Sequence, residues 1–261
     1  MSDAFYRLLA DGSFESSPAT AGPWGPDSQH GGPPSALLAR AFERCDPVPG
    51  QRLARLTVEF LRPVPIAPLT MQARVVRPGR RVTLLEGAVV AGGEPVLLAR
   101  GWRIGTPSEL GPEVGATGAV PDLPSASSTD AWPGAYLGGY MSAIEWRVVR
   151  GALSEPGPGV VWARQRPALV EGEQVSPFCR AAIVADSGSG VSASVDLGRW
   201  LSINIDLTLT IYRAPVGDWI LLDAATALDP GGAGLADTRL ADWRGAFGRV
   251  QQTMVLDARQ H

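Results

Sequence analysis

A weak internal repeat is the feature of this sequence that most limits what the chain can fold into. Three landmarks recur in the same order: the end of a strand-like run, a turn signal, and a glycine before a final strand. They stand at Arg62 and Arg213, at 77–79 and 229–231, and at Gly93 and Gly245, with spacings of 151, 152 and 152 residues. Such a near-constant spacing predicts two copies of one folding unit.

The middle of the chain separates the two copies. Residues 107–135 are rich in Pro, Gly, Ser and Ala and show little hydrophobic periodicity, which is typical of a linker. We therefore divide the 261 residues into an N-terminal unit, 1–106, and a C-terminal unit, 136–261. A chain of this size can bury a hydrophobic core without disulfides or metals.

Each unit is expected to contain one helix and an antiparallel meander of strands. Apolar residues from Leu37 to Phe42 form one stripe of a helix over 31–44, which begins with Gly and Pro. The other expected elements are strands at 53–62, 69–77, 81–91 and 95–105, strands at 143–150 and 160–166, a helix at 175–185, and strands at 200–213, 218–228, 234–242 and 247–257. One helix laid across an antiparallel sheet, twice over, predicts an α+β fold.

Charge and composition exclude several functions. The formal net charge is −3, which disfavours nucleic-acid binding. All 23 basic residues are Arg, so chemistry that needs a Lys, such as a Schiff base or a P-loop, is excluded. Cys45 and Cys179 fit no metal or redox spacing, and we expect neither a metal nor a cofactor. We find no signal peptide and no apolar run of membrane-spanning length, and therefore expect a cytoplasmic protein.

Short motifs in both units resemble those of a known family. They are Trp24, Gln29–Pro34 leading into a helix, Glu59–Val64, Pro95–Gly101, Ala185–Gly188, Ile205–Arg213 and Val250–Gln251. In their order and spacing they resemble the double-hotdog acyl-CoA thioesterases, and the chain is similar to the bacterial type II enzymes over nearly its whole length. The resemblance implies a central helix wrapped by a curved antiparallel sheet in each unit, and an acyl-CoA substrate.

The resemblance also implies a catalytic set. In the family this set comprises an Asp near the second central helix, a Thr or other small polar residue on the next strand, and a Gln on the last strand. Position by position, these become Asp186, Asn204 and Gln251, with Gln252 as the alternative to Gln251. Asn204, the single Asn of the chain, replaces the more usual Thr, and its amide is still able to bind a water.

Thioester hydrolysis needs an activated water and donors for the oxyanion that develops. Asp186 is expected to take the proton of the water, which Asn204 and Gln251 would orient. Backbone N–H groups near Gly188 are expected to form the oxyanion hole, because glycine allows a close approach. This chemistry needs neither a metal nor a covalent intermediate.

His30 and Gly31 stand where the first helix begins. In single-hotdog thioesterases this position lines the acyl site, and a carboxylate on the helix serves the chemistry. Here residues 35–42 hold no carboxylate, so we interpret the first unit's own site as degenerate, and His30 has either a substrate-lining or a structural role. The sequence has no Gly-x-Ser-x-Gly motif and no second internal His, which argues against a Ser–His triad.

Two other functions stay open at this point. An acyl-CoA or acyl-carrier binding protein would keep the fold without the chemistry, and an enoyl-thioester hydratase or dehydratase would use His30 with an acidic partner. Hotdog units pair through their sheets, so we also expect a homodimer or a larger homo-oligomer. The length of the acyl chain depends on side-chain packing, which the sequence does not reveal.

Overall fold

The first part of the chain folds into a helix and a set of antiparallel strands. The computed structural model describes residues 4–112, 114–115, 119–127, 131–132, 134–152 and 155–259. The elements before the linker are β1 (Ala4–Leu8), β2 (Phe14–Ser16), the 3-10 turn η1 (Pro18–Thr20), α1 (Gly32–Arg44), β3 (Gln51–Phe60), β4 (Leu69–Arg77), β5 (Val82–Ala91) and β6 (Glu94–Gly105).

The second part repeats this arrangement with small additions. Its elements are α2 (Tyr140–Ala143), β7 (Ile144–Ala152), β8 (Glu155–Gln165), β9 (Ala168–Val170), α3 (Pro177–Ala185), α4 (Gly188–Val191), β10 (Trp200–Asn204), β11 (Asp206–Ile211), β12 (Ile220–Leu228), β13 (Ala233–Asp242) and β14 (Gly245–Ala258). The expected helices and long strands are confirmed within a few residues, except that the strand expected over 200–213 is interrupted at Ile205. The short strands β1, β2 and β9 have no counterpart among the sequence-based predictions.

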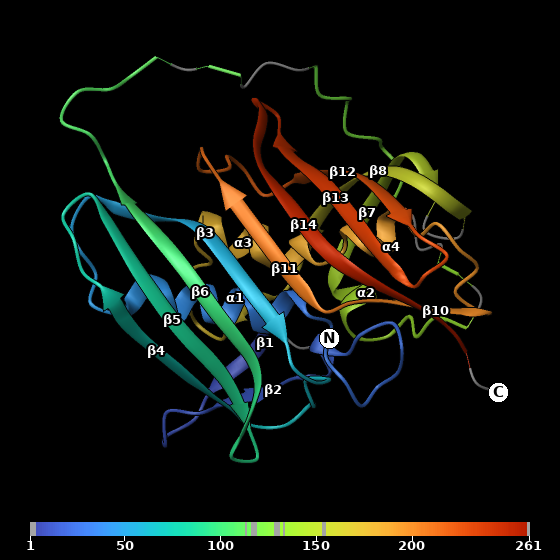
Figure 1. The fold of residues 1–261 in the computed structure, drawn as a ribbon, viewed down its shortest axis with the longest axis horizontal. Coiled ribbons are helices and arrows are strands. Elements are labelled where there is room, and N and C mark those ends of the chain that lie inside the picture. Colours follow the sequence, from blue (N-terminus) through green and yellow to red (C-terminus); the bar gives the residue numbers. More distant parts are fainter. Residues whose placement is uncertain are drawn as a thin grey trace.

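The strands join into one continuous sheet whose two halves mirror each other in order. From the junction outwards, the first half runs β3-β6-β5-β4-β2-β1 and the second runs β11-β14-β13-β12-β8-β7. The junction is an antiparallel ladder between β3 and β11, and Figure 1 shows the sheet passing from the blue-green to the orange-red strands there. The repeat in the sequence is therefore a repeat in the structure, and the α+β prediction is confirmed.

The two long helices lie against the same face of this sheet and run antiparallel to each other (Figure 1). A Cβ atom on Gly32, at the start of α1, would lie 2.0 Å from the backbone oxygen of Ile183, near the end of α3. At the other end of the pair, Ser176 Oγ donates to Glu43 Oε1 over 2.9 Å. The start of each helix thus meets the end of the other.

The helices fill the core between themselves and the curved sheet. Leu37, Leu38 and Phe42 on α1 are fully buried, as are Ile183 and its neighbours on α3. Pro33 and Pro34 begin α1, where the missing N–H groups cost no helical hydrogen bond. Among the described residues, no helix is long and apolar enough to cross a membrane.

Candidate active site

Asp186 lies directly after α3, where the end of this helix meets the start of α1. The apolar sequence of α3 buries the helix on most of its surface, and so carries the carboxylate with it: only 7% of Asp186 is exposed. A buried carboxylate needs hydrogen-bond donors, because leaving its charge unpaired would be costly. The surroundings of Asp186 show where those donors come from.

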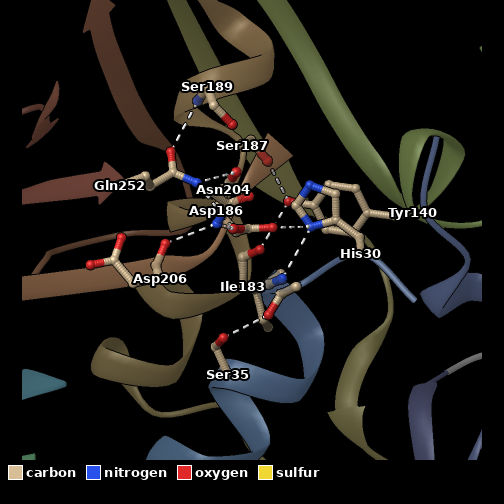
Figure 2. A network of polar contacts seen from close by, with 12 residues as sticks. His30, Ser35, Tyr140, Ile183, Asp186, Ser187, Ser189, Asn204, Asp206 and Gln252 are labelled. Atoms are coloured by element: carbon tan, nitrogen blue, oxygen red, sulfur yellow. Dashed lines mark hydrogen bonds and ion pairs between the residues drawn. The ribbon is translucent and has the colours of Figure 1, made fainter. Parts of the chain in front are cut away.

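Two side-chain amides hold one oxygen of Asp186. Asn204 Nδ2 donates to Oδ1 over 2.8 Å, and Gln252 Nε2 donates to the same atom over 3.1 Å. Figure 2 shows both amides on one side of the carboxylate. The remaining donor bonds of the two amides go to backbone oxygens, that of Asp206 for Asn204 and that of Asp186 for Gln252. These amides therefore hold the carboxylate, whereas the sequence led us to expect that they hold a water.

The structure brings Gln252 to the site and keeps Gln251 away from it. Successive residues of β14 point to opposite faces of the sheet. Gln252 is fully buried beside Asp186, whereas Gln251 is exposed on the outer face and hydrogen-bonds Asp237. The placement expected for Gln251 is therefore corrected by one residue. The apolar residues Val250 and Met254 share the inward face with Gln252, and this alternation was the signal in the sequence.

His30 approaches the other oxygen of Asp186. Its Nδ1 lies 3.4 Å from Asp186 Oδ2 and accepts a hydrogen bond from the backbone N–H of Gly32 over 3.1 Å. Burial lowers the pKa of His30, and the charge of Asp186 offsets this effect only in part. His30 is therefore neutral near pH 7, with an acceptor nitrogen facing Oδ2.

Tyr140, which the sequence did not reveal as a site residue, fixes the ring of His30. The two rings stack with centroids 3.7 Å apart and planes within 5° of each other (Figure 2). The Tyr140 hydroxyl donates to the backbone oxygen of Ile183 over 2.9 Å and lies 2.8 Å from Ser187 Oγ. Burial raises the pKa of Tyr140, so this hydroxyl stays protonated. Ser187 follows Asp186 directly in the sequence. The contacts of Tyr140 therefore connect the His30 ring to the same end of α3 that carries Asp186.

Gly31 makes the close approach between the two halves possible. A Cβ atom at this position would lie 2.7 Å from Asp186 Oδ2 and 2.7 Å from the ring of Phe60, and real Cβ contacts are never that short. The backbone N–H of Gly31 makes no hydrogen bond within the described residues. Since Gly31 precedes the first turn of α1, this N–H is a free donor at the positive end of a helix.

Gly188 has a packing role instead of the one expected from the sequence. Its place against Thr238 leaves no room for a side chain, because a Cβ atom would lie 2.1 Å from Thr238 Oγ1. Gly188 is not among the described residues that line the cavity beside Asp186. The next backbone donor, the N–H of Ser189, is already bonded to Gln252 Oε1 over 3.0 Å. The structure thus favours Gly31 over Gly188 as the source of an oxyanion donor.

A cavity of about 420 Å³ opens beside Asp186. Both halves contribute to its wall, with Gly31 and Phe60 from the first half and Asp186 and Asn204 from the second. Apolar side chains make up most of the remaining lining, which is typical of a site for an apolar ligand with a few orienting polar groups. At the rim, the rings of Trp24 and Trp132 lie 5.3 Å apart.

The arrangement combines a buried carboxylate with a backbone N–H that has no partner among the described residues. Asp186 Oδ1 is held by the two amides, whereas Oδ2 receives no hydrogen bond from the described residues and lies 3.4 Å from the acceptor atom Nδ1 of His30. No cluster of three or more His, Cys, Asp or Glu that could hold a metal occurs in the described part of the chain.

Family models identify the chain. The model of the acyl-CoA thioesterase N-terminal domain matches residues 20–104, and the model of the C-terminal domain matches residues 120–256. The chain belongs to the acyl-CoA thioesterase family. It is accordingly a thioester hydrolase, and the enzyme class expected from the sequence is confirmed. A comparison with curated proteins gives no significant match.

Solved structures share the fold of this thioesterase. Acyl-CoA thioesterase II TesB2 from Mycobacterium marinum is 19% identical with a TM-score of 0.69, and the match covers 89% of this chain and 91% of that one. The tesB protein of Mycobacterium avium subs paratuberculosis is 17% identical, with a TM-score of 0.66 and 88% of both chains covered.

A third structure supports the same fold. It is a conserved protein with a hot dog fold from Alicyclobacillus acidocaldarius, 16% identical with a TM-score of 0.73, and the match covers 95% of this chain and 93% of that one. At these identities the likeness concerns the fold alone, and it confirms the double-hotdog architecture of the thioesterase.

Proposed function

We propose that this thioesterase hydrolyses acyl-CoA thioesters to a free acid and CoA, with a water activated by Asp186. The observation that supports this proposal most strongly is the state of the Asp186 carboxylate. Asn204 and Gln252 hold its Oδ1, Oδ2 receives no hydrogen bond from the described residues, and Asp186 lines a mostly apolar cavity. A carboxylate fixed in this way has one oxygen left to accept a proton from a water.

The reaction is then a direct attack by water. As the water oxygen bonds to the thioester carbonyl carbon, its proton moves to Asp186 Oδ2, an effect worth about 10²–10⁴ in rate. In this proposal the free N–H of Gly31 donates to the carbonyl oxygen, where negative charge develops. Collapse of the tetrahedral intermediate breaks the carbon–sulfur bond, and the proton on Asp186 returns to the leaving thiolate.

His30 serves this proton transfer as a positioning residue. When Oδ2 of Asp186 carries the proton, it faces the acceptor atom Nδ1 of His30, which lies 3.4 Å away. The stack on Tyr140 keeps the imidazole in this orientation. A neutral His30 thus favours the protonated carboxyl group over the carboxylate, whose negative charge faces the lone pair of Nδ1. The hydrogen bond from the Gly32 N–H keeps Nδ1 in this position.

The test is a thiol-release assay with acyl-CoAs of graded chain length. Wild type should release CoA, and Asp186→Asn, which keeps the size of the side chain, should be slower by at least about 10²-fold. Circular dichroism and calorimetric binding of a non-hydrolysable acyl-CoA analogue should show that the variant folds and binds. Equal rates for wild type and Asp186→Asn would contradict the proposal. Tight binding without turnover by wild type would instead support a binding protein.

We further propose that the thioesterase forms a homodimer or larger homo-oligomer through the outer face of its sheet. Leu98 on β6 and Leu235 on β13 are 43% and 45% exposed on this face, so its packing against a second copy would bury apolar surface. Light scattering during size-exclusion chromatography measures the mass, and a monomer at micromolar concentration would contradict this proposal.

A further inference from the structure

The cavity beside Asp186 has an exposed rim and a buried inner end. Trp24 and Leu61 at the rim are both 48% exposed. The inner lining includes Tyr140, Trp146 and Val191, none of which is more than 3% exposed. Asp186 lines the same cavity, and a ligand that enters at the rim ends against these three side chains.

Hydrogen bonds hold the two aromatic side chains of the inner end in place. Trp146 Nε1 donates to the backbone oxygen of Met141 over 3.1 Å, and the Tyr140 hydroxyl is bonded to Ile183. The two rings meet edge to face with centroids 6.3 Å apart, a favourable geometry for aromatic pairs. Moving either ring would break a buried hydrogen bond, so the inner end is a rigid wall.

The volume in front of this wall limits the ligand. At about 420 Å³, the cavity lies in the lower part of the range of about 300–1,000 Å³ that is typical of small-molecule sites. The thioester group and the adjoining carbons on its sulfur side occupy part of this volume. A cavity of this size therefore favours a short or medium acyl chain over a long one.

We infer that Trp146, backed by Tyr140, is the end wall of the acyl site and makes the thioesterase specific for acyl chains of short to medium length. The inference rests on the proposed acyl-CoA hydrolysis and adds its substrate class. The polar atoms of both aromatic side chains already have protein partners, so the wall presents mainly ring surface to the end of an acyl chain.

The test compares kcat/KM for acyl-CoAs of four to sixteen carbons in wild type and three variants. Trp146→Ala should move the optimum towards longer chains by roughly four carbons, because the indole leaves a space that relaxes only in part. Val191→Phe adds volume at the same end and should move the optimum towards shorter chains. Each change should alter the ratio of dodecanoyl-CoA to octanoyl-CoA turnover by about tenfold or more.

Trp162→Ala is the matched control. Trp162 lies on the neighbouring strand β8, is 4% exposed, and packs in a separate cluster with Val160 and Leu221, away from the cavity. It should lose stability as Trp146→Ala does, but keep the wild-type chain-length profile. Should Trp146→Ala fail to fold, Val191→Phe still tests the inference from the opposite direction.

The outcomes separate this inference from the proposed function. Absence of thiol release by wild type at every chain length would overturn the proposed function itself. Efficient wild-type turnover of hexadecanoyl-CoA, or an unchanged profile in both cavity variants, would overturn the end wall while leaving the hydrolysis intact. A shift in Trp162→Ala equal to that in Trp146→Ala would also overturn it.

Discussion

Thr57 and Thr208 face each other across the junction of the two half-sheets, with their hydroxyl oxygens 3.3 Å apart. They are direct partners in the ladder between β3 and β11, and 151 residues separate them in the sequence. This separation equals the spacing between Arg62 and Arg213 in the internal repeat. Equivalent residues of the two units thus pair with each other, which places a local two-fold axis between these threonines.

The two-fold axis relates the candidate active site to the other end of the helix pair. At that end Glu43 is bonded to Ser176 Oγ, and Cys179 Sγ lies 3.5 Å from its Oε2. The neighbouring space is only about 100 Å³. The first unit, whose own site the sequence suggested to be degenerate, therefore does hold a carboxyl group on its long helix. This group belongs to Glu43, one residue beyond the segment 35–42.

Replacement of this second carboxyl group should leave catalysis unchanged. Burial raises the pKa of Glu43 above its usual value, so the folded state holds this proton more tightly than the unfolded state does. Glu43 therefore makes the free energy of unfolding fall as the pH rises from about 4.5 towards its raised pKa. Glu43→Gln should remove this slope in urea unfolding series and keep wild-type thiol release. A strong loss of activity would show that the second end takes part in the reaction.

The register of β14 gives a direct test of the corrected site. Gln252→Ala removes a donor to Asp186 Oδ1 and should lower kcat by about 10²-fold, because a misplaced base loses its alignment. Gln251→Ala, one residue earlier on the outer face, should stay within about twofold of wild type, as surface substitutions generally do. Thiol-release kinetics of the two variants decide between the neighbours, and the reverse result would refute the register argument.

Gly31 should not tolerate a methyl group. In Gly31→Ala the new Cβ would lie 2.7 Å from Asp186 Oδ2, so the carboxylate or the start of α1 must move. A displacement of this kind is expected to reduce kcat by about 10²-fold. Gly111→Ala makes the same change where no atom lies within 4 Å of the new Cβ, and should behave as wild type. Comparable loss in both variants would point to a general effect on folding.

His30 should make stability depend on pH. Because its pKa is lowered in the folded state, the unfolded chain binds the proton more readily. Its contribution to stability is complete above the ordinary His pKa of about 6.5 and is lost as the pH falls from there towards the lowered value. In urea unfolding between pH 5 and 8, His30→Gln should give a flatter curve than wild type. Parallel curves would show that His30 is not the group responsible.

Two aspartates on β13 should differ in their importance for stability. Asp242 is fully buried and accepts hydrogen bonds from Arg213 over 2.8 and 2.9 Å. Asp242→Ala should therefore cost about 3–5 kcal/mol of unfolding free energy. Asp237 pairs with Arg249 nearer the surface, and Asp237→Ala should cost about 0–1 kcal/mol. Urea denaturation measures both, and similar losses would contradict the distinction.

The sequence predicts the architecture because its signals are local or periodic. Turn residues, the apolar stripe of α1 and alternating strands are each contained in a few neighbouring residues. The repeat adds long-range information, since equivalent residues such as Thr57 and Thr208 pair at the junction. The short strands β1, β2 and β9 were missed because three to five residues carry too weak an alternation to stand out.

The candidate site was predicted only in part, for a related reason. The family resemblance leads to Asp186 and Asn204, which the structure does bring into contact. Tyr140 and His30 stack on each other although most of the first unit and the linker separate them in the sequence. No spacing in the sequence indicates this contact. The roles of the amides depend on which donors are already bonded, and only the three-dimensional contacts reveal this.

The place of β14 has a consequence for the synthesis of the protein. This strand lies between β13 and β11, so it joins the outer strands of the second half to the rest of the sheet. It also supplies Gln252, which follows Asp186 by 66 residues. A nascent chain that has emerged from the ribosome as far as β13 therefore has an open sheet and a carboxylate without one of its donors. The addition of β14 therefore completes both the sheet and the candidate site of the thioesterase.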